Sequence, residues 1–157
     1  MPRSALVALH AASGAVALLT ITVFWTSALA ADLALGPVEL VAVRTAILYA
    51  LPLLVLALAV TGGSGAHLAG RSKAPLVRAK RRRMALAATN GLLVLVPCAV
   101  FLGWRARSGD LGAPFAVVQG VELVAGAVNI VLLGLNMRGG LGMRVRRTRA
   151  RTAGGVA

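Results

Sequence analysis

Four long, continuously apolar stretches are the feature that most constrains the fold of this chain of 157 residues. They cover residues 4–31, 38–67, 84–104 and 114–137, and a helix that spans a bilayer needs roughly 20 predominantly apolar residues. Strands are disfavoured because polar and apolar residues do not alternate, and a membrane barrel needs many more segments of about 10 residues each. The sequence therefore predicts an all-α, polytopic integral membrane protein, folded as an antiparallel bundle of four transmembrane helices.

The composition excludes an ordinary soluble domain. The chain is 59% hydrophobic and 13% charged, whereas soluble domains are about 45–50% apolar and about 25% charged. Residues 32–37 and 105–113 are short connections that force hairpins. We expect a four-helix transmembrane domain over residues 1–140, followed by a basic cytoplasmic tail, residues 141–157, that is disordered.

The positive charges are distributed unevenly along the chain. It has 17 Lys and Arg against 4 Asp and Glu, a net charge of +13. Fourteen of the cations precede the first stretch, separate the second from the third, or follow the fourth, and no acid lies among them. By the positive-inside rule, both termini and the central loop are cytoplasmic, in a prokaryotic inner or plasma membrane. The basic residues are expected to contact anionic head groups, and nucleic acid is not expected because no aromatic residues are interleaved with them.

The first stretch also has features of a secretory signal peptide. Arg3 precedes an apolar segment, and Ala28-Leu29-Ala30 resembles a small-residue cleavage site. The apolar segment is nevertheless roughly 25 residues long, where signal peptides have about 7–15. We therefore expect this stretch to be retained as a transmembrane helix.

The fourth stretch carries a seam of polar and small residues on one helical face. Its members follow spacings of three and four residues: Gln119, Glu122, Gly126, Asn129, Leu133 and Asn136. The other faces are Val, Leu, Ile and Ala, so the seam should point into the bundle. Its amides can hydrogen-bond across helices, and Gly126 would allow a neighbour to approach closely. Helix association is one interpretation of the seam, and a polar ligand pocket is the other.

Arg44 and Glu122 are charged residues inside apolar stretches. Both lie roughly 10–12 Å from the non-cytoplasmic end of their helices, at 1.5 Å per residue. An unpaired charge at that depth is costly, so we predict that Arg44 and Glu122 form a structural ion pair. Alternative partners are Asp32 or Glu39 for Arg44, and Arg105 for Glu122. A proton relay through Glu122 is the functional rival, although a relay needs further acids or histidines, and the sequence places none near Glu122 on the outer side.

The two histidines, His10 and His67, are predicted to lie at a similar distance from the cytoplasmic side of the membrane, on the first two helices. Two facing imidazoles could ligate the iron of haem b, with Asn90 and Asn136 as hydrogen-bond partners around them. Another metal or a quinone-like ligand is a further alternative. The simplest interpretation is that both histidines are interfacial or structural residues.

The sequence contains no recognisable catalytic motif. Phosphate-binding loops, HExxH, CxxC and GxSxG patterns are absent, and Cys98 is the single cysteine. We therefore expect a non-enzymatic accessory or assembly subunit of a larger membrane complex. The alternatives are a bis-His, haem b electron-transfer bundle and a small transporter that acts as an oligomer. The expected partners are another membrane protein or further copies of the chain.

Overall fold

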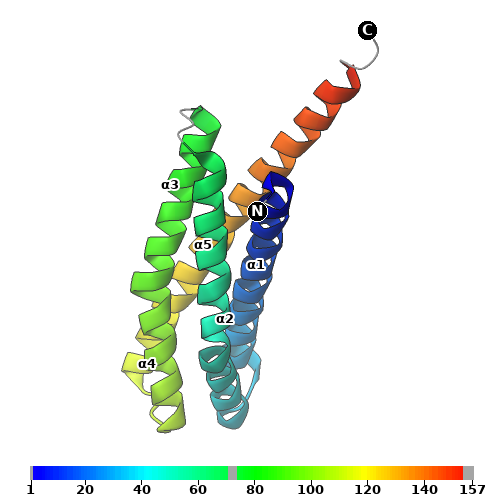
Figure 1. Cartoon of the computed structure of the whole chain (residues 1–157). Helices are drawn as coiled ribbons and strands as arrows, with labels where there is room; N and C mark the ends of the chain where they lie inside the picture. Colours follow the sequence, from blue (N-terminus) through cyan, green and yellow to red (C-terminus); the bar gives the residue numbers. More distant parts are fainter. Residues whose placement is uncertain (1, 71–73, 154–157) are drawn as a thin grey trace.

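The chain is almost entirely helical. The computed structural model describes residues 2–70 and 74–153, including their side chains apart from those of residue 141 and residues 143–153. Within these ranges there is no strand, and four helices are long and apolar enough to cross a membrane (Figure 1). The prediction of an all-helical chain with four membrane-length helices is confirmed.

The first two helices form a tight pair. Helix α1 spans Arg3–Ala34 and helix α2 spans Pro37–Ala69, so only two residues separate them. Pro37 occupies the first turn of α2. An N–H at this position would have no partner within the helix, so proline loses no hydrogen bond there. Gly70 follows the last residue of α2, and its φ of +49° belongs to a region that glycine enters without strain. The N–H of Gly70 donates to the carbonyls of Ala66 and His67.

The third membrane-length helix is longer than the sequence predicts. It begins at Pro75 rather than near residue 84, and it consists of α3 (Pro75–Asn90), the π-helical turn η1 (Gly91–Leu95) and α4 (Val96–Arg107). The basic run 80–83 therefore lies on a helix. Proline suits the first helical position, and Arg, Lys, Ala and Leu are good helix formers, which explains the earlier start.

The π-helical turn ends at Leu95, two residues before Pro97. The N–H of Val96 reaches back five residues to the carbonyl of Gly91. Pro97 has no N–H of its own, and its ring crowds the carbonyl of Leu93, four residues earlier. A wider turn at this point relieves that crowding without ending the helix.

Helix α5 spans Ala113–Ala153, of which Ala113–Gly140 forms the fourth membrane-length segment. Residues 141–153 of the predicted tail belong to this helix, and residues 154–157 lie outside the described residues. The disorder expected of the tail stays a prediction. The continuation agrees with the Arg, Ala and Met content of the tail, because these residues favour helix.

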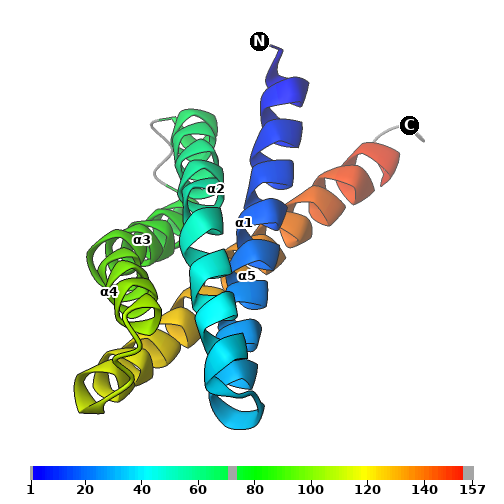
Figure 2. The same ribbon diagram turned by 90° about the horizontal axis from the view of Figure 1, so that it is seen from below.

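The helices pack side by side around a common interior. Helix α1 lies beside α2 and α5, α2 also lies beside α4, and α3 and α4 lie beside α5. The α1–α2 and α4–α5 connections are at one end of the molecule, and the start of α3 is at the other (Figure 1). Figure 2 shows that α5 crosses behind the other helices at an oblique angle.

The interior consists of three apolar clusters stacked along the molecule. One cluster joins Ala17, Ile21, Leu54, Ala57, Ala87 and Leu133, the next joins Ala28, Ile47, Leu51 and Ala99, and the last joins Leu102, Ala106 and Phe115. All three contain alanine, which lets helix backbones approach closely. Polar side chains interrupt these clusters, and they define the candidate site.

Candidate functional site

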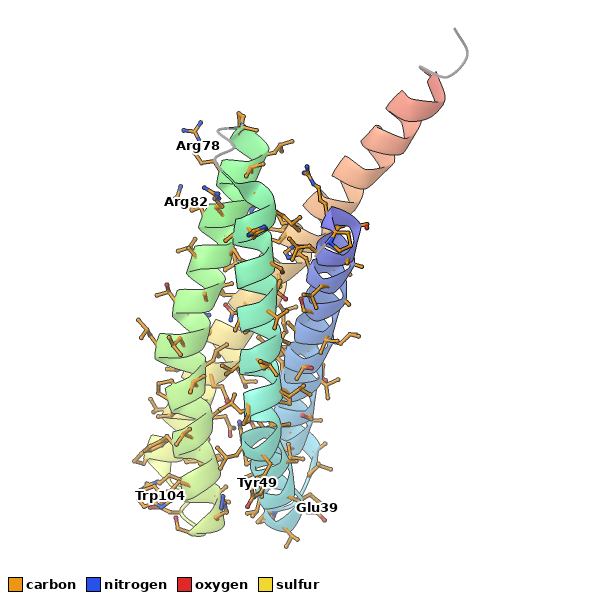
Figure 3. All side chains as sticks on the ribbon, viewed as in Figure 1. Glu39, Tyr49, Arg78, Arg82 and Trp104 are labelled. Atoms are coloured by element: carbon orange, nitrogen blue, oxygen red, sulfur yellow. The ribbon has the colours of Figure 1, made fainter. Side chains whose placement is uncertain are left out.

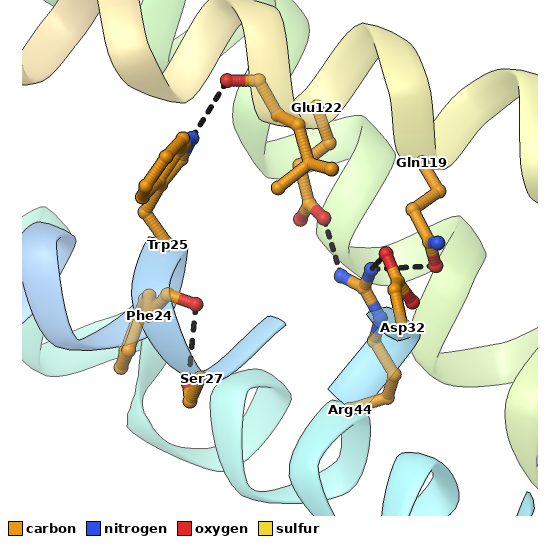
Figure 4. A network of polar contacts seen from close by, with 8 residues as sticks. Phe24, Trp25, Ser27, Asp32, Arg44, Gln119 and Glu122 are labelled. Atoms are coloured by element: carbon orange, nitrogen blue, oxygen red, sulfur yellow. Dashed lines mark hydrogen bonds and ion pairs between the residues drawn. The ribbon is translucent and has the colours of Figure 1, made fainter. Parts of the chain in front are cut away.

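Arg44 is the centre of a polar cluster that joins three helices. Its guanidinium donates to the Glu122 carboxylate through Nη1 and to Gln119 Oε1 through Nη2, the latter at 2.7 Å. Asp32, from the end of α1, lies on another side of the same guanidinium, with Oδ2 at 4.0 Å from Nη2 (Figure 4). The structure therefore brings together Arg44 and Glu122, which the sequence analysis predicted as partners, and it adds Gln119 and Asp32.

The cluster is removed from solvent. The Arg44 side chain is 1% exposed, and those of Asp32 and Glu122 are 10% and 13% exposed. The Phe115 ring covers the guanidinium, with its centroid 5.8 Å from Cζ, a cation–π geometry. One cation thus faces two carboxylates in apolar surroundings. Sequence reasoning had considered Asp32 only as a substitute for Glu122, because it compared depths pair by pair.

The seam on α5 faces the interior along its whole length. Asn129, Leu133 and Asn136 are 0%, 6% and 6% exposed. At Gly126 the close neighbour is Trp25, whose indole N–H donates to the carbonyl of Leu123 at 2.8 Å. A Cβ atom at Gly126 would lie 2.8 Å from Trp25 Cδ1, so this position admits no side chain without a shift.

Asn129 and Asn90 connect α5 to the third helix. The Asn90 side-chain amide donates to the carbonyl of Ala125 and to Asn129 Oδ1, both at 2.9 Å. Asn129 in turn donates to the carbonyl of Ala87 at 3.2 Å. These bonds satisfy amides that would otherwise be costly in an apolar interior, so the part of the seam around Asn129 acts in helix association.

His10 packs against α2 and does not face His67. Its Nδ1 is 3.0 Å from the carbonyl oxygen of Thr61 and 3.1 Å from Ser64 Oγ. The ring lies over Gly65, where an added Cβ would be 2.9 Å from His10 Cε1. His67 is exposed, and it follows Gly65 by two residues, which places it about 200° around the helix from the His10 contact.

The two side-chain amides expected to hydrogen-bond around a haem, those of Asn90 and Asn136, have other contacts in the structure. Asn90 is engaged with α5, and Asn136 Nδ2 lies 3.6 Å from the sulfur of Met84. Haem ligation by His10 and His67 stays a prediction, and it would require His67 to move to the face of α2 that meets α1. The described arrangement does not favour it.

A small cavity adjoins Glu122 in the middle of the bundle. Its volume is about 40 Å³, and apolar side chains such as Phe24, Leu51 and Ala99 line most of it. This is room for a water molecule, but a buried water needs 2–4 polar partners, and Glu122 is the only charged side chain in the lining. The cavity therefore does not resemble a pocket for a polar ligand.

The chemistry available to the Arg44 cluster is electrostatic. Within residues 2–70 and 74–153, no group of three or more His, Cys, Asp or Glu side chains could hold a metal ion. The cluster can bind α1, α2 and α5 together, and its two acids can take up protons. Comparison of the chain with protein-family models, curated proteins and solved structures finds no match.

Proposed function

We propose that the chain is a multi-pass integral membrane protein whose helices form an antiparallel bundle in a prokaryotic inner membrane. Four membrane-length helices support this, as does the separation of charge. Figure 3 places Arg78 and Arg82 at one end of the molecule and Glu39, Tyr49 and Trp104 at the other. With the basic end in the cytoplasm, its Lys and Arg side chains would lie among anionic head groups.

A reporter that is active only in the cytoplasm tests this topology. We expect activity when it is fused after Ala157 or inserted near Pro75, and none when it is inserted near Gly109, because 14 of the 17 cations lie in the three segments assigned to the cytoplasm. A periplasmic reporter should give the reverse pattern at each position. Cytoplasmic activity at Gly109 would contradict the four-span topology.

We further propose that the protein acts as a non-catalytic subunit that packs against an apolar helix of a larger membrane complex. The observation that carries this proposal is an open groove on the outer face of α5, bordered by Asn90 of α3. Its α5 residues recur every three or four positions: Val117, Gly120, Val121, Val124, Ala125 and Val128. Small residues such as Gly120 and Ala125 let helix backbones approach closely in membranes.

The side chains of the groove are shorter than many others on the outer surface. Elsewhere, long side chains such as Leu19, Leu53 and Leu93 extend outward and are 67%, 54% and 67% exposed. At Gly120 an added Cβ would meet no atom within 4 Å, so a partner helix could approach the backbone there. In a bilayer, association depends on van der Waals packing rather than on the hydrophobic effect, and short side chains beside a glycine allow that packing to be close.

Photo-crosslinking in native membranes tests the partner proposal. A photoactivatable amino acid at Val121, in the groove, is compared with the same amino acid at Leu53, which is similarly exposed (48% against 54%) but lies on α2. We expect one discrete adduct with a different membrane protein from position 121 only. Mass spectrometry of the adduct then identifies the partner.

Other results would count against the subunit role. Equal labelling from both positions, or lipid adducts alone, would mean that the groove simply faces the bilayer. An adduct of twice the chain's own mass would mean that the groove joins two copies, and the protein would then act as a homo-oligomer.

A further inference from the structure

Asp32 is a largely covered acid that the Gln119 side chain approaches but to which no hydrogen bond of ordinary geometry is made. Its side chain is 10% exposed, and neither carboxylate oxygen has a hydrogen-bond partner in the described part of the chain. The guanidinium of Arg44 faces it at 4.0 Å but directs its Nη atoms to Glu122 and Gln119. A carboxylate held in this way has no short charge-assisted bond to stabilise its charge.

The charges in the cluster do not balance. Arg44 contributes one positive charge, while Asp32 and Glu122 contribute two negative charges when both are ionised. A single uncompensated charge is costly in the low-dielectric interior of a bundle. Two carboxylates that share one site relieve such an excess by binding a proton, and they then titrate as a pair.

Among the side chains that the structure describes, Arg44 is the one cation that pairs with these two acids. Arg105 of α4, the other arginine considered as a partner for Glu122, forms an ion pair with Asp110 at 2.7 Å. The remaining titratable group that interacts with Glu122 is the thiol of Cys98 on α4, which carries no positive charge. Glu39, in the first turn of α2, is exposed and lies outside the cluster.

We propose that Asp32 and Glu122 together bind one exchangeable proton, and that Arg44 holds the two acids in place. The proton comes from water and forms an O–H bond on one carboxylate, so the charge of the cluster changes from minus one to zero. Loss of the proton to water reverses this step. The site is thus a proton-binding site in the outer half of the bundle, a role that a purely structural ion pair would not have.

Asp32 is the member of the cluster closest to a helix end. Asp32 lies two residues before the end of α1 at Ala34, next to the α1–α2 connection at the non-basic end of the molecule. Arg44 is deeper and almost completely covered. The proposal rests on the membrane-embedded bundle proposed above but not on the partner at the α5 groove.

Infrared spectroscopy of the protein in lipid bilayers tests the proposal. A protonated carboxyl group has a C=O stretching band that a carboxylate lacks, and this band shifts when H₂O is exchanged for D₂O. We expect the band in the wild-type protein at neutral pH, and we expect it to disappear in both Asp32→Asn and Glu122→Gln. Each substitution leaves one carboxylate for one guanidinium, so the remaining acid stays ionised.

The control variant is Glu39→Gln, which removes an exposed acid outside the cluster and should leave the band unchanged. A wild-type spectrum without the band would overturn the proposal, even if neither cluster variant folds. A band that survives either cluster substitution would also overturn it, because the proton would then belong to one acid alone. Failure of the reporter test at Gly109 would instead contradict the membrane topology, so the two results can be told apart.

Discussion

Replacing Arg44 by glutamine is expected to lower the free energy of unfolding by about 3–5 kcal/mol, the usual effect of removing one partner from a buried ion pair. The guanidinium is the single cation facing Asp32 and Glu122, and it also donates to Gln119. Its loss leaves two buried acids without a counter-charge and removes a contact that joins α1, α2 and α5. Denaturant unfolding of the purified protein in detergent measures the change.

Glu122→Gln provides the matched comparison. It should destabilise less than Arg44→Gln, because Asp32 remains beside the guanidinium as a carboxylate. The double variant should be more stable than the sum of the two single changes predicts, since it removes both members of the pair. Strictly additive effects would show that Arg44 and Glu122 do not interact in the folded protein.

Replacing Gly126 by alanine is expected to lower the free energy of unfolding by about 1–3 kcal/mol, which is typical of overpacking. The new methyl carbon would lie 2.8 Å from Cδ1 of Trp25. If the indole shifts away, its hydrogen bond to Leu123 is lost as well, at about 1 kcal/mol. A change in Trp25 fluorescence should accompany the loss of stability.

Gly134→Ala is the control on the same helix. An added Cβ there would meet no atom within 4 Å, and alanine is a better helix former than glycine by about 1 kcal/mol. The same chemical change should therefore leave stability unchanged or raise it. Equal effects at Gly126 and Gly134 would mean that Trp25 does not pack on α5 as described.

The helices and the inward face of α5 could be predicted from the sequence because both depend on local patterns. Length and apolar content identify a membrane-length helix without knowledge of its neighbours. The spacing of Gln119, Glu122, Gly126 and Asn129 places them on one face, and polar groups avoid lipid. Comparing depth along each helix was enough to suggest Arg44 and Glu122 as partners.

The composition of the cluster and the relation of the two histidines could not be predicted in this way. Depth alone cannot tell whether Asp32 joins an existing pair or replaces one of its members, because that depends on how α1 is rotated. His10 and His67 have similar depth, yet the contact of His10 with Gly65 turns His67 to the opposite side of α2. Helix rotation follows from side-chain packing between helices, which periodicity does not encode.

The wide turn before Pro97 shifts the phase of the third helix. Ala87 and Ala99 are both buried, at 1% and 6% exposure, although twelve residues of regular α-helix would leave them about 120° apart. The π-helical turn Gly91–Leu95 rotates less per residue and takes up most of this difference. Residues before and after it therefore follow two different registers, and a helical wheel drawn through the whole segment would assign inward and outward positions wrongly on one side of the turn.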